Sequence, residues 1–283
     1  MTTDQQTATT LPSPQYAVVD GLRVRYATGG SATGRPVLLT SPWPESIIAF
    51  SAIWDDLADV APLLAVDLPG FGKSEGRPDI MNPRAMGSFL VRLVKEFSLD
   101  APHAVCPDVG TSAILYAAAD HDRTFTSLTV GAGAMDERSV AGTLKQIVEA
   151  PDTKAFEGAD GGDIVATAVP QLRETPPSEE ELRDYRESYA GDRFVKSMAF
   201  VRTYPQSLPP LRALLPTIDT PVQVLYGRRD PLVPPENGEL LGRSLPHVLV
   251  VALDSGHFAW QDTAAEYGAA VRKWIEGGYR DVM

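Results

Sequence analysis

The sequence predicts an α/β fold in which helices flank a mostly parallel β-sheet and a helical lid is inserted into the sheet-forming core. Short apolar runs alternate with helical patterns up to residue 134 and again from residue 217. The segment between them is charged and helical in its spacing, and no part of it has the pattern of a strand. We therefore expect a core made of residues 15–134 and 217–283, and a lid made of residues 135–216.

The composition disfavours several classes of function. The chain has 283 residues, of which 43% are hydrophobic and 22% charged, as in a soluble globular protein. A net charge of -12 disfavours binding to nucleic acid and to anionic membranes, because both attract basic surfaces. The sequence contains no run of about 18 apolar residues, so we expect no transmembrane helix.

The first residues and the cysteine content indicate a cytoplasmic protein. The N-terminal residues are polar and lack the apolar stretch of a signal peptide, so residues 1–14 are predicted to form a disordered tail. Cys106 is the single cysteine, which excludes an internal disulfide and fits a reducing compartment. Its position beneath a predicted turn indicates a small packing residue and not a reactive thiol.

In the first core segment, the spacing predicts a hairpin and then alternating strands and helices. A period-two pattern on both sides of Asp20-Gly21 predicts the hairpin. Continuous apolar runs predict buried strands at residues 36–40, 62–66, 102–105 and 125–130. A first helix is expected to bury Ile47, Ile48, Phe50 and Trp54. A second begins at the cap pair Asn82-Pro83 and is expected to bury Met86, Phe89, Leu90, Leu93 and Phe97.

The lid and the second core segment are predicted by the same patterns. Ser178 and Glu181 form a capping-box pattern, which starts a lid helix with Leu182, Tyr185 and Tyr189 on one face. Strands are predicted at residues 221–226 and 248–252. A last helix is expected to bury Ala264, Tyr267, Val271 and Trp274.

The stretch Cys106-Pro-Asp-Val-Gly110 predicts a sharp turn between a strand and a helix. Such a turn lifts the residue at its apex, Asp108, above the sheet, and the helix behind it offers free N–H groups and positive partial charge. Gly110 leaves room where the strand and the helix come closest. On these residues alone, Asp108 is more readily interpreted as a helix N-cap. A catalytic role for Asp108 requires matching residues further along the chain.

Three residues lie just after predicted strands, namely Asp108, Asp230 and His257. The carboxyl ends of parallel strands meet at one edge of a sheet, where ligands bind, so we expect these side chains to come together. Their order along the chain, nucleophile then acid then histidine, is that of a hydrolytic triad. Asp136 and Asp254 compete for the role of the acid; we interpret the first as a lid hinge and the second as a turn residue.

Other candidate sites are excluded by their position or by a missing residue. His103 and His247 begin strands, so they should lie at the opposite edge of the sheet. The loop of residues 67–74 ends in Gly-Lys-Ser, as a phosphate-binding loop does, but Asp67 stands where the first glycine is required. We therefore expect no nucleotide, no cofactor and no metal.

Five motifs occur in order along the chain: Ser41-Pro-Trp-Pro-Glu-Ser46, Asp67-Leu-Pro-Gly-Phe-Gly-Lys-Ser74, Pro107-Asp-Val-Gly110, Gly227-Arg-Arg-Asp230 and Gly256-His-Phe258. Together they resemble the α/β-hydrolase superfamily, and within it the branch with an aspartate nucleophile, the epoxide hydrolases and haloalkane dehalogenases. The resemblance covers about residues 15–283. The first motif differs from the family's His-Gly-Trp-Pro-Glu-Ser at its first two positions.

The resemblance implies a reaction in which Asp108 forms an ester with a saturated carbon of the substrate. A carboxylate that attacked an ester carbonyl would give a high-energy anhydride, whereas attack on an sp³ carbon gives an ordinary ester. A water molecule deprotonated by His257, which Asp230 orients, would then attack this ester. The backbone N–H groups of Trp43 and Val109 would hold the resulting oxyanion.

Two kinds of leaving group fit this mechanism. Haloalkane dehalogenases usually carry a halide-binding Trp where this chain has Val109, whose side chain cannot donate a hydrogen bond, although the Trp43 indole could partly replace that Trp. Similar epoxide hydrolases use lid tyrosines as acids. We select Tyr204 as the proton donor and interpret Tyr185 and Tyr189 as lid packing. The prediction is an epoxide hydrolase that forms a vicinal diol, with a dehalogenase-like hydrolase as the alternative.

A third interpretation is a non-hydrolytic protein that binds or cyclises a biosynthetic intermediate. The altered Ser41-Pro42 pair suggests it, whereas a complete triad argues against it. The expected partner is a small, largely apolar molecule. The sequence leaves the oligomeric state open.

Overall fold

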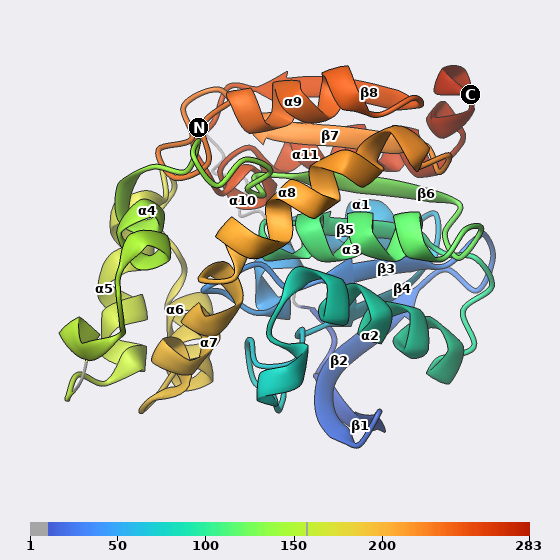
Figure 1. Cartoon of the computed structure of the whole chain (residues 1–283). Coiled ribbons are helices and arrows are strands. Elements are labelled where there is room, and N and C mark those ends of the chain that lie inside the picture. The colour runs from blue at the N-terminus through green and yellow to red at the C-terminus, as the bar shows by residue number, and fades with distance from the viewer. Residues whose placement is uncertain (1–10, 157) are drawn as a thin grey trace, which may run out of the picture.

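An eight-stranded β-sheet forms the centre of the computed structural model, which describes residues 11–156 and 158–283 (Figure 1). The strands lie in the order β1-β2-β4-β3-β5-β6-β7-β8. Their bounds are β1 Gln15–Val19, β2 Leu22–Gly30, β3 Val37–Thr40, β4 Pro62–Val66, β5 His103–Pro107, β6 Ser127–Gly131, β7 Val222–Gly227 and β8 Val248–Leu253. The β2 strand is antiparallel to β1 and β4, and all other neighbours are parallel. The predicted α/β class and mostly parallel sheet are confirmed.

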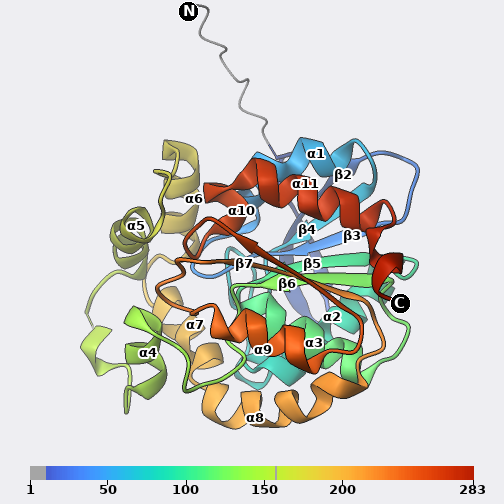
Figure 2. The same cartoon turned by 90° about the horizontal axis from the view of Figure 1, so that it is seen from above.

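Helices cover both faces of this sheet (Figure 2). On one face lie α2 Pro83–Glu96, α3 Val109–Asp120, α8 Tyr204–Leu214 and α9 Glu236–Ser244. On the other lie α1 Trp54–Ala58, α10 Ala259–Asp262 and α11 Ala264–Ile275. Strand residues such as Leu38, Val105 and Val130 are fully buried between these layers. The α2 helix begins as predicted, because the Asn82 side chain accepts a hydrogen bond from the Ala85 amide.

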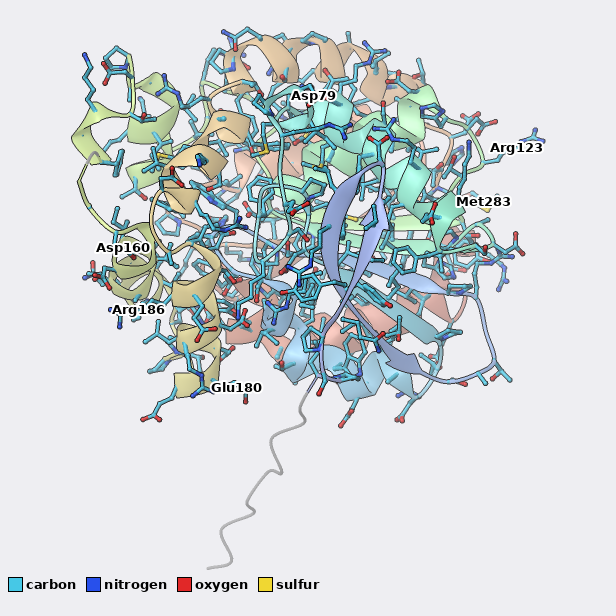
Figure 3. All side chains as sticks on the ribbon, turned by 90° about the horizontal axis from the view of Figure 1, so that it is seen from below. Asp79, Arg123, Asp160, Glu180, Arg186 and Met283 are labelled. Carbon is cyan, nitrogen blue, oxygen red and sulfur yellow. The ribbon has the colours of Figure 1, made fainter. Side chains whose placement is uncertain are left out.

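The described residues between β6 and β7 form helices and no strand. These helices are α4 Gly142–Glu149, α5 Gly161–Leu172, α6 Glu179–Ser188, α7 Arg193–Val201 and α8. We call α4 to α7 the lid; they lie to one side of the sheet, and α8 returns across the core (Figure 1). The predicted capping box of Ser178 and Glu181 starts α6. Charged side chains, among them Asp160, Glu180 and Arg186, lie on the outer surface of the lid (Figure 3).

Two predicted features differ from the structure. The helix expected after residue 46 is mostly a 3₁₀-helix, Ile47–Ile53, followed by the short α1. Most residues of the 3₁₀-helix are buried, and they do not form the single apolar stripe of a surface α-helix. Packing against neighbours on several sides therefore determines its conformation. Residues 1–10 of the predicted tail lie outside the described residues, but Leu11 is only 4% exposed and packs into the core. Burial of this apolar side chain means that the packed chain begins before residue 15.

The sequence predicted no transmembrane helix, and the described helices can be compared with this prediction. None of them combines the length and the apolarity that crossing a bilayer requires.

Candidate active site

Asp108 occupies a strained turn between β5 and α3. Its backbone has φ 53° and ψ -125°, a positive φ that side chains rarely adopt. Asp108 stands at the N-cap position of α3, but its side chain makes no capping hydrogen bond to the helix. Gly110 permits the close approach of strand and helix, because a Cβ atom there would lie 2.4 Å from Thr40 Oγ1. The turn therefore presents the Asp108 carboxylate away from the helix backbone.

The Asp108 carboxylate is held between a backbone amide and an imidazole. Its Oδ2 atom accepts a hydrogen bond of 2.6 Å from the Trp43 amide, and its Oδ1 atom lies 3.7 Å from His257 Nε2. The residue is only 6% exposed. Val109 follows it as the first residue of α3, and within the described residues its amide makes no hydrogen bond to this carboxylate. One of the two predicted oxyanion donors therefore already contacts Asp108.

His257 is oriented by Asp230. Its Nδ1 atom lies 2.7 Å from Asp230 Oδ2, and Asp230 Oδ1 accepts hydrogen bonds from the Leu232 and Val233 amides at 2.8 and 2.9 Å. Burial disfavours the charged imidazolium, but the carboxylates of Asp230 and Asp108 outweigh it and raise the pKa of His257 to about 10. The three side chains that follow β5, β7 and β8 thus form one contiguous chain of contacts.

The two competing carboxylates have other partners. Asp136 forms an ion pair of 2.6 Å with Arg138, and this hydrogen-bonded contact lowers the pKa of Asp136 to about 2. Asp254 pairs with Arg229. His103 lies at the start of β5, where its ring contacts the Ser127 hydroxyl. The geometry therefore brings Asp230, and neither Asp136 nor Asp254, to His257.

A cavity of about 460 Å³ lies between the lid and the edge of the sheet, over Asp108 and His257. Its wall is mostly apolar and includes Trp43, Leu144, Ile147, Phe156, Ile164, Leu172, Phe194, Val201, Leu232 and Val233. Among the described residues that line it, Asp108, His257 and Tyr204 are the titratable ones, while Thr143, Gln146 and Gln171 are neutral and exposed. The cavity size is that of a small-molecule site.

Tyr204 is the lid-side tyrosine that reaches this cavity. It begins α8, is 2% exposed and lines the cavity together with Asp108. Burial raises the pKa of Tyr204 well above its ordinary value, and its hydroxyl has no hydrogen-bond partner within the described residues. Tyr185 accepts a hydrogen bond from Gln261, and Tyr189 donates one to the Glu45 carbonyl. Neither is among the described residues of the cavity wall, and the hydroxyl of each already has a hydrogen-bond partner.

Sequence patterns missed two groups at this site. The carboxyl of Glu45 is fully buried, and its Oε2 accepts a hydrogen bond of 2.9 Å from the Trp260 indole. Burial raises the pKa of Glu45 to about 8. Ser197 on α7 accepts a hydrogen bond of 2.7 Å from the Trp43 indole. Glu45 belongs to the motif Ser41–Ser46, and this position could have marked it as a candidate site residue. No sequence pattern marks Ser197.

The part of the chain that the structure describes was compared with the requirements of a metal site, and the one cysteine with those of a reactive thiol. Within residues 11–156 and 158–283, no group of three or more His, Cys, Asp or Glu side chains is placed to hold a metal ion. Cys106 is buried beneath the turn, and burial raises its pKa to about 12, which keeps the thiol protonated. The chemistry available here is that of a carboxylate, an imidazole and a phenol.

Comparisons with known proteins agree with this geometry at the level of the fold. Residues 35–262 match the family model described as alpha/beta hydrolase fold. The solved structure of the haloalkane dehalogenase DbeA from Bradyrhizobium elkani USDA94 aligns with a TM-score of 0.79 over 96% of this chain and 99% of that chain, at 23% identity. A likeness at this identity shows the fold alone.

Curated relatives match over shorter segments. The chain is 31% identical over 105 residues to a soluble epoxide hydrolase from Corynebacterium sp. (strain C12), which covers 37% of this chain and 36% of that protein. It is also 31% identical over 116 residues to the dihydrolipoyllysine-residue acetyltransferase component of the acetoin cleaving system from Cupriavidus necator. That match covers 41% of this chain and 31% of the relative. The chain thus spans about a third of the length of these relatives, whose names describe different reactions.

Proposed function

Because the chain belongs to the α/β-hydrolase fold family, we propose that it is a hydrolase that forms an ester on Asp108 and opens epoxides to vicinal diols. The position of the Asp108 carboxylate carries this proposal. It lies between the Trp43 amide and His257, at the floor of an apolar cavity. A carboxylate in this position is suited to attack a saturated carbon and not an acyl carbon.

The proposed reaction has two steps. In the first, Asp108 Oδ1 bonds to an epoxide carbon, the C–O bond to that carbon breaks, and the opening oxygen takes a proton from Tyr204. In the second, His257 removes a proton from water, the hydroxide attacks the ester carbonyl carbon, and the diol leaves. The proton taken by His257 replaces the one given by Tyr204, so the epoxide and one water together yield the diol.

The charges around His257 support this order of events. With Asp108 ionised, His257 lies between two carboxylates, and its pKa of about 10 makes it an imidazolium at neutral pH. Esterification removes the negative charge of Asp108, so the pKa of His257 falls and the imidazolium returns a proton to the Tyr204 phenolate. The neutral imidazole that remains is the base that accepts a proton from water. The second step thus gains its base only after the first step has occurred.

The hydrogen bonds at the site favour an epoxide over a halide. A departing halide needs a side-chain donor in this position, but the Val109 side chain has none and the Trp43 indole donates to Ser197. The Tyr204 hydroxyl faces the same cavity as Asp108 and has no other partner within the described residues. Dehalogenation therefore remains the weaker alternative, and a purely non-hydrolytic role leaves the ordered triad unexplained.

The cavity wall supports an uncharged, largely apolar substrate. Apart from Asp108 and His257, which the proposed reaction uses, its described residues carry no charge, so a charged group on the substrate would lose its hydration without gaining a further ionic partner.

A single turnover in ¹⁸O-water, with enzyme in excess, tests the ester directly. Attack of water on the ester places label in the Asp108 carboxylate, which the mass of its peptide reveals. Product formation without label in that peptide would show that Asp108 is not the nucleophile. The variant His257→Gln should form the ester and fail to hydrolyse it, so the intact protein gains the mass of the substrate. Asp108→Ala, as the control, should show neither the added mass nor turnover.

A further inference from the structure

Trp43 connects Asp108 to the lid. Its backbone amide donates to Asp108 Oδ2 at 2.6 Å, while its indole Nε1 donates to Ser197 Oγ at 2.7 Å. Ser197 lies on α7 and is fully buried. A single residue of the core therefore contacts the nucleophile with its backbone and the lid with its side chain.

Two contacts from one turn of α7 fix the indole. The Ser197 hydroxyl donates its only proton to the Phe194 carbonyl at 2.6 Å, which leaves its lone pairs to accept from the indole. The Phe194 ring stacks on Trp43, with centroids 5.4 Å apart and ring planes at 11°. Because Phe194 and Ser197 are three positions apart on a helix, they present one surface to the indole. The ring is held across its face and at its N–H edge.

We propose that Ser197 is a positioning residue, which fixes the Trp43 indole and thereby the direction in which the Trp43 amide points at Asp108. Ser197 is not part of the cavity wall, so it acts through Trp43 and does not touch the substrate. The inference rests on the proposed ester mechanism. It also gives the lid a second function, since α7 sets the geometry of an oxyanion donor as well as covering the cavity.

The two half-reactions distinguish this role from general packing. During alkylation, the Trp43 amide bonds to a carboxylate nucleophile and stabilises the ground state, so a misdirected amide should not slow attack. During hydrolysis, the same amide holds the negative charge that develops on the ester oxygen, so a misdirected amide should slow this step. Loss of Ser197 is therefore expected to act on the second step alone.

Rapid-quench mass spectrometry of Ser197→Ala with a small epoxide tests the inference. We expect hydrolysis to slow about tenfold while alkylation keeps at least its wild-type rate, so that the ester accumulates at steady state. Ser188→Ala is the matched control, because Ser188 is also a fully buried lid serine but its hydroxyl bonds to Asp184. That variant should not accumulate ester.

Trp43→Phe supplies an independent measurement, since it removes the indole donor and keeps an aromatic ring and the amide. It should slow hydrolysis like Ser197→Ala, and the double variant should lose no more than either single one. Equal slowing of both steps, unchanged hydrolysis in Ser197→Ala, or additive losses would overturn the positioning role. Absence of any ester in the wild type and in His257→Gln would instead overturn the Asp108 mechanism.

Discussion

At the residue scale, the proposed opening of an epoxide depends on the hydroxyl of Tyr204. An alkoxide is a poor leaving group, so the opening oxygen needs a proton from a group within the cavity. We expect Tyr204→Phe to slow the alkylation step about 10²-fold, with little change in ester hydrolysis. Single-turnover rates of ester formation measure this effect. Tyr185→Phe is the control, because Tyr185 is equally buried but lies outside the cavity wall. Equal rates in the two variants would reduce Tyr204 to a packing residue.

Glu45 gives a second prediction at this scale, based on its pKa of about 8. At pH values between 4.5, the ordinary pKa of a glutamate, and about 8, the pKa of Glu45 in the folded protein, the Glu45 carboxyl is protonated when the chain is folded and ionised when it is unfolded. Unfolding thus releases a proton in this window, and stability falls as pH rises, by at most about 1.4 kcal/mol per pH unit. Glu45→Gln is always neutral and can still accept from the Trp260 indole, so the variant should lose this contribution to the slope.

Urea denaturation of the wild type and Glu45→Gln at pH values from about 5 to 8 measures the difference. The variant should gain stability relative to the wild type as pH rises. Glu96→Gln, on the exposed face of α2, is expected to follow the wild type at each pH. A constant difference between Glu45→Gln and the wild type would mean that Glu45 is ionised throughout.

Single residues also show where sequence reasoning succeeds and where it ends. The spacing of Asp108, Asp230 and His257 after separate strands was sufficient to predict that they meet, because parallel strands align their carboxyl ends. The proton state of Glu45 depends on burial by distant segments, and the contact of Ser197 joins residues 154 positions apart. Neither the proton state of Glu45 nor the contact of Ser197 can be predicted from a local sequence pattern.

At the scale of elements, a buried charge cluster attaches the lid to the core. Asp184 on α6 accepts hydrogen bonds from Arg25 on β2 at 2.9 and 2.8 Å and from the Ser46 hydroxyl at 2.6 Å. Lys73 lies 2.9 Å from the same carboxylate. Burial opposes the charge, but the bonds to Arg25 prevail and the pKa of Asp184 is lowered. The Gly-Lys-Ser sequence that imitates a phosphate-binding loop thus serves to hold the lid.

Removing this charge should destabilise the protein strongly. Asp184→Asn leaves Arg25 buried with only the more distant Asp67 carboxylate at 3.5 Å, and loss of one partner of a buried pair typically costs about 3 kcal/mol. Equilibrium urea unfolding measures the change. Asp163→Asn breaks the exposed pair with Arg186, in which both side chains are 61% exposed, and should cost less than about 1 kcal/mol. Similar losses in the two variants would show that the cluster does not stabilise the attachment.

The elements themselves were predictable to different degrees. Caps and apolar stripes located α2 and α6, because their start signals are local side-chain to backbone hydrogen bonds. The segment after Ser46 was predicted as a helix but is largely 3₁₀, since its burial is set by neighbours on several sides. The cavity could not be derived at all, because it depends on how α4 to α7 pack over the sheet.

At the scale of the whole molecule, the negative net charge and the lack of lysine and arginine in the described cavity wall both disfavour an anionic substrate. The 37 acidic and 25 basic side chains give a field that repels anions, whereas a neutral epoxide offers no charge on which this field can act. We therefore expect kcat/KM for a neutral substrate to change less than about twofold between ionic strengths of about 0.02 and 0.3 M. For an epoxide of similar size that carries a carboxylate, kcat/KM should be lower and should rise with salt, as screening weakens the repulsion. Initial rates across a salt series measure both. A preference for the anion at low salt would show that local positive charge guides the substrate, and that the substrate class inferred from the cavity wall is wrong.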